Sequence, residues 1–383
     1  MSKWQWAILV FTILAIGGYW FGFIPAREYP SGEKSLARFT PGPYKVVTED
    51  FKAVDEKRAT APNNDFPGRP VRVLKGKVWR PQGLQQPGPL LVYSHGFMSF
   101  HEEGKYLVTF LASHGYTVVA VDYPLTNFFA PGKPKLTDVV NQPGDVTFLI
   151  DTMLKRAQDK NDVLYNTIDD RKIAVAGVSL GGLTSTLVAY HRKVLDPRIA
   201  AAISIAGPSA MFTPAFFAGS HVPFLMIYGD GDAIVPYEKN AAPLLQKFPG
   251  STLVTLKHAS HAAFAQPGST FLRFYSNPDG IGCRQVLANL HNDKAMENND
   301  FMKELDGAQY GVDMSDRSAP CSGPLIPVAM KAARQHVFTT LAAHAFLESQ
   351  FATDAAARTE ATGYLLKTLP AENSQDVRVE KSQ

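Results

Sequence analysis

Short apolar segments alternate with amphipathic segments through the middle of the chain. Val, Ile, Leu or Ala occupies most positions of each apolar segment, which is typical of strands buried on both faces of a sheet. These predicted strands are Pro89–Tyr93, Tyr116–Val121, Lys172–Ala176, Ala200–Ala206, Phe224–Tyr228 and Thr252–Leu256. The amphipathic segments predict helices at Glu103–Ser113, Gly144–Lys155, Gly182–Tyr190 and Glu238–Gln246. Strands that alternate with helices predict an α/β fold with a doubly wound, mostly parallel sheet.

The segment before this alternation has a different pattern. Polar and apolar residues alternate at Tyr44–Val47 and Val71–Trp79, which predicts antiparallel N-terminal edge strands with one wet face. Residues 27–43 are rich in Pro, Gly and charged residues, and we interpret them as a tether. A single α/β domain is then expected over residues 44–383.

The segment after the alternation contains an interruption. Residues 266–324 are rich in Gly, Asn and Asp and predict a C-terminal insertion. A last long helix is expected at about Val328–Gln350. The polar tail after Leu369 is expected to fray.

The amino terminus is the most apolar part of the chain. No charged residue lies between Lys3 and Arg27, and Trp4 to Ile24 is almost wholly apolar or aromatic. That length fits the roughly 20 helical residues that cross a bilayer. We therefore expect residues 1–26 to form one membrane anchor, with a cleaved signal peptide as the alternative. The single Lys3 favours an extracytoplasmic domain, which would be periplasmic, or secreted if the segment is cleaved.

Composition and charge narrow the range of partners. The chain has 383 residues, a formal net charge of +3 and no stripe of Lys and Arg, so we expect no nucleic-acid partner. Its two cysteines, Cys283 and Cys321, both lie in the predicted insertion and lack the CxxC spacing of metal or redox sites. A disulfide and two free thiols are both consistent with the sequence.

The most informative motif is the G-x-S-x-G pentapeptide centred on Ser179. It follows a predicted strand and precedes a predicted helix, which is the context of a nucleophile elbow. Gly177 and Gly181 flank the serine, where a side chain would crowd the close approach of strand and helix. Ser179 is therefore our candidate nucleophile, and a serine hydroxyl needs a nearby base and a group that orients the base.

An acid and a histidine follow Ser179 in the order expected for this kind of fold. Asp230 and Asp232 both come after the strand that ends at Tyr228, and we favour Asp232. His258 and His261 both come after the next strand, and we favour His261 because it lies further from the strand end, in a loop that can reach Ser179. The carboxyl ends of parallel strands meet at one edge, so these groups are expected to converge.

The same edge should provide donors for an oxyanion. One expected donor is the backbone N–H of Leu180, and the other is that of Phe97, in the loop after the first buried strand. Phe97 and Met98 are also expected to contact substrate. His95 is interpreted as structural. The aromatic segment Met211–Phe217 is interpreted as an acyl pocket or lid, or as ordinary core.

With these residues placed, the chain resembles the α/β-hydrolase superfamily, in its branch of dienelactone-hydrolase-like and platelet-activating-factor-acetylhydrolase-like enzymes. Bacterial cutinase-like polyester hydrolases are similar over the same parts. Dienelactone hydrolases use a cysteine nucleophile, whereas this chain has a serine. Besides the elbow and the loops of Asp232 and His261, the matching segments are Ser94–Phe97, Leu111–Tyr116 and Gly144–Leu149.

The resemblance implies an α/β-hydrolase fold and a serine esterase that uses a Ser179–His261–Asp232 triad, with Phe97 and Leu180 as oxyanion donors. The expected substrate is a small-molecule or lipid-like carboxylic ester, with no metal and no cofactor. A peptidase or acyltransferase could use the same triad, and a non-catalytic binding module could share the fold.

Overall fold

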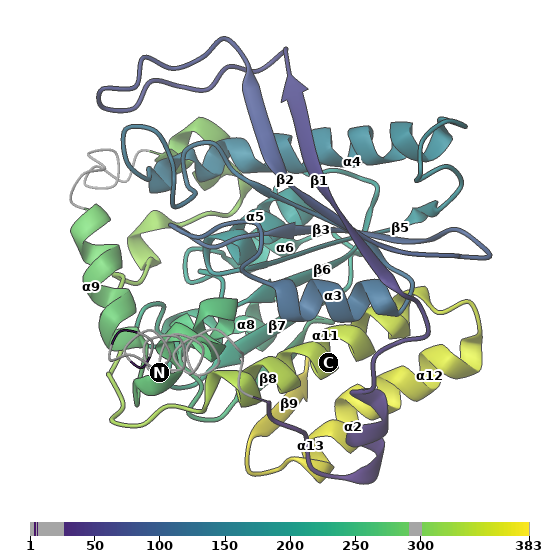
Figure 1. The fold of residues 1–383 in the computed structure, drawn as a ribbon. Helices are drawn as coiled ribbons and strands as arrows, with labels where there is room; N and C mark the ends of the chain where they lie inside the picture. The colour runs from purple at the N-terminus through teal and green to yellow at the C-terminus, as the bar shows by residue number, and fades with distance from the viewer. Residues whose placement is uncertain (1–3, 5, 7–26, 291–300, 383) are drawn as a thin grey trace.

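The computed structural model describes residues 27–290 and 301–382, together with Trp4 and Trp6 (Figure 1). Within these ranges nine strands form one sheet, in the order β1-β2-β4-β3-β5-β6-β7-β8-β9. The strands β3 to β8 are mutually parallel, while β1, β2 and β9 pair antiparallel with their neighbours. The strands are β1 (Val46–Asp55), β2 (Arg72–Pro81), β3 (Gly88–Ser94), β4 (Thr117–Asp122), β5 (Ile168–Val178), β6 (Ile199–Ile205), β7 (Phe224–Gly229), β8 (Thr252–Leu256) and β9 (Val377–Lys381). The predicted α/β class, the doubly wound sheet and the antiparallel edge strands are confirmed.

Helices cover both faces of this sheet, as right-handed crossovers between parallel strands require (Figure 1). On one face α3 packs against α11, and on the other α4 packs against α5. The helices are α2 (Glu33–Arg38), α3 (Lys105–Ser113), α4 (Gln142–Gln158), α5 (Leu180–Tyr190), α6 (Pro214–Phe217), α7 (Tyr237–Asn240), α8 (Leu244–Lys247), α9 (Asp279–Leu290), α11 (Ala332–Phe351), α12 (Ala355–Gly363) and α13 (Leu369–Glu372).

The core lies on both sides of the central strands. Leu90, Leu91 and Val92 of β3 are completely buried although their side chains point alternately to the two faces. The same holds for the apolar positions of β7. Continuous burial follows because helices exclude water from both faces, which explains why the apolar segments of the sequence do not alternate with polar residues.

The C-terminal tail is ordered, so the expectation that it frays was wrong. β9 adds to the edge of the sheet by pairing with β8, and Val377 is buried. The Lys257 N–H donates to the carbonyl of Asp376, which anchors the start of this strand. A five-residue polar-apolar alternation was too short to stand out in the sequence, and its stability comes from the neighbouring strand.

The predicted helix at Glu238–Gln246 is interrupted. It forms two single-turn helices, α7 and α8, with Pro243 immediately before α8. Proline has no N–H to donate and its ring crowds the carbonyl one turn earlier, so a continuous helix cannot pass through this position.

Residues 27–43, predicted as a tether, pack against the end of the chain. The Ser35 N–H at the start of α2 donates to Glu372 at 2.8 Å, and Ser31 N–H donates to Asn373 at 2.8 Å. Lys331 forms an ion pair with Glu28. The first described segment is therefore bound to the C-terminal helices.

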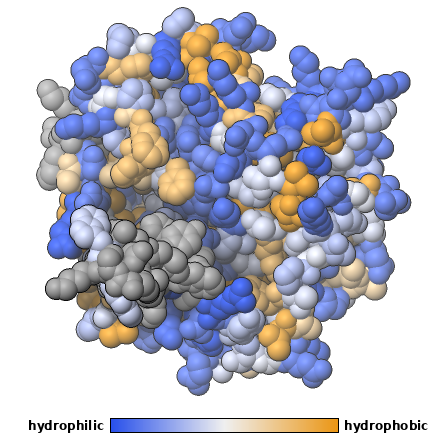
Figure 2. Space-filling view, viewed as in Figure 1, coloured by the Kyte–Doolittle hydropathy of each residue, from blue (hydrophilic) through white to orange (hydrophobic). Residues whose placement is uncertain are grey.

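The predicted membrane anchor lies outside the described residues, apart from Trp4 and Trp6. Within the described ranges, no helix combines the length and the apolar character needed to cross a bilayer. The face of the molecule seen in Figure 2 is mostly hydrophilic, with hydrophobic patches scattered over it.

Candidate active site

Ser179 lies in the strained turn that connects β5 to α5. Its backbone has φ 54° and ψ −119°, a conformation that L-residues rarely adopt. A Cβ at Gly177 would collide with the backbone of Gly181, and a Cβ at Gly181 would collide with the carbonyl of Ser94. The Ser179 N–H donates to the carbonyl of Ile205 at 2.7 Å, which holds the turn against β6. This geometry is that of a nucleophile elbow, in which strain presents the hydroxyl at the sheet edge.

Asp232 and His261 meet at the carboxyl ends of β7 and β8. The His261 Nδ1 atom lies 2.6 Å from Asp232 Oδ2, and both side chains are buried. The other carboxylate oxygen of Asp232 accepts the N–H groups of Ile234 and Val235, at 3.0 and 2.7 Å. An ionised carboxylate can only accept, so the neutral imidazole paired with it has its proton on Nδ1 and its lone pair on Nε2.

The competing acid and histidine have other roles. Asp230 accepts the backbone N–H of His258, and the His258 side chain is exposed. The His258 carbonyl accepts the N–H of Met330, which ties this turn to the segment before α11. The structure therefore brings together Asp232 and His261, while Asp230 and His258 form a local turn.

His261 sits in a strongly negative environment. Burial opposes the charged imidazolium, but the carboxylates of Asp232, Asp279 and Glu103 outweigh it and raise the pKa of His261 above its usual value. A buried imidazole surrounded by carboxylates is well suited to accept a proton and hold it.

The loop after β3 lies directly beside the elbow. A Cβ placed on Gly96 would be 3.3 Å from the Cβ of Ser179. The Gly96 N–H donates to Glu103 at 2.8 Å and the Met98 N–H donates to the Thr126 carbonyl at 2.9 Å. Phe97 lies between these two fixed points.

Leu180 and Met98 complete this edge of the site. Leu180 is the first residue of α5, so its N–H has no carbonyl one turn earlier in the helix to bond. Met98 adopts a positive φ of 59°. Both Phe97 and Met98 are half-buried, so their side chains reach the surface of the molecule.

His95 and the aromatic segment Met211–Phe217 also lie near the predicted site in the sequence. His95 is completely buried, and its Nε2 accepts the N–H of Tyr123 at 3.0 Å, in agreement with a structural role. Of the aromatic segment, Phe212 and Phe216 are buried and stack at 4.0 Å between ring centroids. The phenylalanine rings of that segment therefore belong to the core, while Pro214 and Ala215 of the same segment are exposed.

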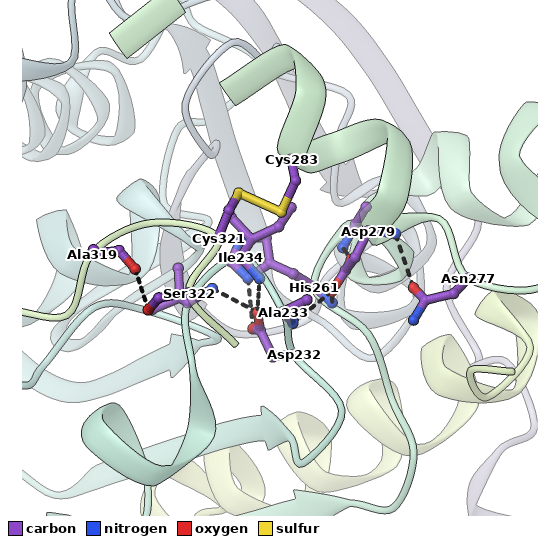
Figure 3. Close-up of a disulfide and its surroundings, with 12 residues drawn as sticks. Asp232, Ala233, Ile234, His261, Asn277, Asp279, Cys283, Ala319, Cys321 and Ser322 are labelled. Atoms are coloured by element: carbon purple, nitrogen blue, oxygen red, sulfur yellow. Dashed lines mark hydrogen bonds and ion pairs between the residues drawn. A yellow bond between two sulfur atoms is a disulfide. The ribbon is translucent and has the colours of Figure 1, made fainter. Parts of the chain in front are cut away.

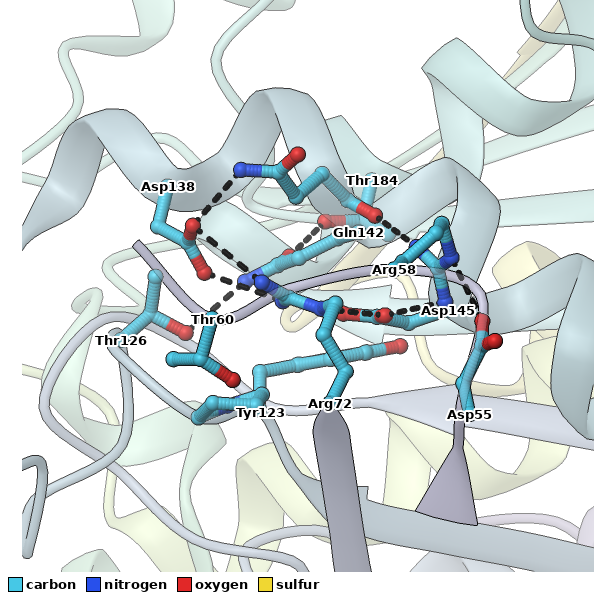
Figure 4. Close-up of polar contacts among 12 residues, drawn as sticks. Asp55, Arg58, Thr60, Arg72, Tyr123, Thr126, Asp138, Gln142, Asp145 and Thr184 are labelled. Carbon is cyan, nitrogen blue, oxygen red and sulfur yellow. Dashed lines mark hydrogen bonds and ion pairs between the residues drawn. The ribbon is translucent and has the colours of Figure 1, made fainter. Parts of the chain in front are cut away.

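A buried ion network centred on Arg72 lies in the same region as Thr126 (Figure 4). Arg72 is 1% exposed and binds both oxygens of Asp145, at 2.8 and 2.6 Å, and one oxygen of Asp138 at 3.1 Å. Gln142 donates to the Thr126 hydroxyl at 2.8 Å. The Thr126 carbonyl accepts the Met98 N–H, so the bond from Gln142 to Thr126 helps to hold the loop that carries Phe97.

Two buried carboxylates near the site, Glu103 and Asp279, were not predicted from the sequence. Glu103 was assigned only to the start of a helix, and Asp279 only to the insertion. Glu103 is bound to Gly96, and Asp279 accepts the backbone N–H of His261 at 3.0 Å. The sequence contains one signal for Asp279: the Asn-Pro-Asp tripeptide at 277–279 is typical of a helix start.

The two cysteines are bonded to each other. Cys283 of α9 and Cys321 form a disulfide, with their Cα atoms 5.6 Å apart (Figure 3). The Cys321 N–H donates to the carbonyl of Ile234, two residues after Asp232, at 2.8 Å. The insertion is thus joined to the loop that carries the acid.

Comparisons with known proteins agree with this architecture. The family model described as PET hydrolase-like matches residues 72–276, more than half of the chain. That range contains the elbow and the loops of Asp232 and His261. A comparison with curated proteins gives no match. The fold, the strained elbow and the extent of this match together mean that the chain belongs to the PET hydrolase-like family of α/β hydrolases, whose members act on ester bonds.

Proposed function

We propose that this protein is a serine carboxylic-ester hydrolase. Ser179 attacks the acyl carbon of the ester while His261 takes its proton, and Asp232 holds the imidazole in the required tautomer. His261 then gives the proton to the leaving alcohol, which leaves an acyl group on Ser179. Water, activated by His261, releases the acid and restores the serine.

The observation that carries this proposal is the Asp232–His261 hydrogen bond on the same sheet edge as the Ser179 elbow. The N–H groups of Phe97 and Leu180 would stabilise the oxyanion of each tetrahedral intermediate. Losing one such donor typically costs about 10²–10³ in turnover. Phe97 and Met98 would contact the substrate, a small-molecule or lipid-like ester.

A fluorophosphonate probe tests the nucleophile directly. Wild-type protein should be labelled on Ser179, and the S179A variant should be neither labelled nor active on nitrophenyl esters. An unlabelled but folded wild type would favour a non-catalytic binding module. Faster turnover of peptide anilides than of esters would favour a peptidase, and ester transfer to an added alcohol without net hydrolysis would favour an acyltransferase.

We also propose that residues 1–26 anchor the protein to a membrane and that the hydrolase domain is extracytoplasmic. The apolar sequence from Trp4 to Ile24 supports the anchor, and the disulfide supports an oxidising compartment. If the segment is cleaved instead, the domain would be periplasmic or secreted.

A further inference from the structure

The insertion supplies a buried carboxylate that contacts both loops of the acid–histidine pair. Asp279, the first residue of α9, is completely buried. One of its oxygens accepts the N–H of His261 at 3.0 Å and that of Ala233 at 2.9 Å, and the other accepts the N–H of Ala262 at 2.7 Å. Figure 3 shows the Asp279 side chain between these two loops.

These bonds cross between segments that are distant in the sequence. Ala233 directly follows Asp232, and Ala262 directly follows His261. A single rigid carboxylate therefore fixes the main chain beside the acid and beside the base at the same time. Hydrogen bonds to a charged acceptor are roughly twice as strong as neutral ones, and a buried carboxylate depends on them for its stability.

Asp279 is itself held in place on two sides. The Asn277 side chain accepts its backbone N–H at 3.0 Å. One turn further along α9, Cys283 forms the disulfide with Cys321. The segment around Cys321 is hydrogen-bonded to the loop that carries Asp232. In that segment the Gly323 N–H donates to the Ala233 carbonyl at 3.2 Å. Asn277 and the disulfide therefore hold Asp279 in place, and Asp279 in turn holds the loops of Asp232 and His261.

We propose that Asp279 is the positioning residue that sets the geometry between Asp232 and His261, through its bonds to Ala233, His261 and Ala262. This inference rests on the proposed function, because it assigns a role within that reaction. Asp279 does not touch the reacting atoms. Its effect is through loop placement, where a displacement of about 1 Å can cost on the order of 10²-fold in rate.

The charge of Asp279 has a second, separable effect. The groups that act on the His261 imidazolium are Asp232, Asp279 and Glu103, with burial acting in the opposite direction. Removing the Asp279 charge should lower the pKa of His261. A residue with only a structural role far from the imidazole would leave that pKa unchanged.

The test is the D279N variant, which is nearly isosteric but loses the charge and replaces one acceptor with a donor. We expect kcat on a nitrophenyl ester to fall by about 10- to 100-fold, with KM within about twofold of wild type. The midpoint of the pH profile of kcat/KM should shift to lower pH. The matched control is D196N, because Asp196 is a buried carboxylate that accepts the N–H of Arg198 at 3.0 Å before β6, at the opposite edge of the sheet. D196N should reduce stability without changing kcat or the pH midpoint.

The outcomes test the role of Asp279 and the proposed function separately. A folded D279N with wild-type kcat and pH midpoint overturns the role of Asp279, and so does an equal loss of kcat in D196N. Absence of fluorophosphonate labelling on Ser179 in wild type overturns the proposed function instead. Should circular dichroism show D279N unfolded, D279E is measured: a reduced kcat with the wild-type pH midpoint supports the inference, and a wild-type kcat overturns it.

Discussion

Three buried acids, Asp232, Asp279 and Glu103, act on the charge of the His261 imidazole. Asp232 bonds the imidazole itself, whereas Asp279 is held by backbone N–H groups and Glu103 accepts the N–H of Gly96. All three favour the protonated histidine. The surroundings of His261 therefore stabilise its imidazolium form, as the proposed role as a base requires.

The pH profile of ester hydrolysis follows from this environment. His261 must be neutral to act as a base, so activity is present above its pKa and is lost as the pH falls through it. Because its pKa is raised, the midpoint of kcat/KM should lie above the ordinary histidine value of about 6.5. Assays of a nitrophenyl ester from pH 5 to 9 measure this midpoint. A flat profile, or a midpoint well below the ordinary value, would contradict the assignment of His261.

Glu103 should make stability depend on pH. Burial raises the pKa of Glu103 from 4.5 to about 7, despite the bond from Gly96. The unfolded chain therefore ionises this group at a lower pH than the folded protein, so its contribution to stability is full below pH 4.5 and falls as the pH rises to 7. E103Q keeps an acceptor for Gly96 and should be more stable than wild type by up to about 3 kcal/mol at pH 8, with little difference at pH 4.5.

Urea unfolding at the two pH values measures this effect. The control is E102Q at the adjacent position, because Glu102 is half-exposed, pairs with Lys77 and has a lowered pKa. E102Q should not gain stability at pH 8. Parallel pH dependence of wild type and E103Q would contradict the prediction.

At the residue scale, the sequence identified groups whose roles depend on motif and order. Ser179, Asp232 and His261 follow strand ends in a recognisable sequence, and the structure joins two of them directly. Asp279 and Glu103 were missed because their importance depends on burial and on contacts with distant loops. Neither property has a periodic signature along the chain.

At the scale of elements, the disulfide holds α9 to the segment beside the acid loop. It closes a loop of 38 residues, for which the chain-entropy model gives a stabilisation of up to about 4 kcal/mol. The C283S/C321S double variant should be less stable by about that amount. It should also hydrolyse esters more slowly at temperatures where it stays folded, because Asp279 would be less firmly held. Chemical denaturation and steady-state kinetics measure the two effects.

Reduction provides the matching control. A thiol reductant should lower the stability and activity of wild type toward the values of the double variant, and should leave the double variant unchanged. If the reductant lowered the stability and activity of both proteins equally, the loss would not come from the Cys283–Cys321 disulfide.

The central strands could be predicted from the sequence, whereas the break between α7 and α8 and the strand β9 could not. The buried strands were predicted well because continuous burial requires continuous apolar sequence, as in β3 and β7. The division into α7 and α8 is a local effect of Pro243. β9 was missed because its order comes from pairing with β8.

At the scale of the whole molecule, the segment around α2 is hydrogen-bonded to the segment just before β9. α2 bonds Glu372 and Asn373, which lie just before β9, and β9 completes the sheet. The sequence predicted the doubly wound centre, since alternation of strands and helices allows few topologies. The contacts between α2 and the C-terminal segment could not be predicted, because the segments that make them lie more than 300 residues apart in the sequence.

Removing residues 1–26 should separate membrane attachment from the folded domain. The truncated protein keeps the ion pair of Glu28 with Lys331 and the bond from Arg334 to the Tyr29 carbonyl, so its melting temperature and esterase activity should match those of the full chain. The full chain should remain in carbonate-washed membranes, whereas the truncated protein should be released, because the apolar sequence from Trp4 to Ile24 is absent. An intact mass that begins after residue 26 in the full-length preparation would favour a signal peptide, and a truncated protein that stays with the membrane would show that the folded domain itself binds lipid.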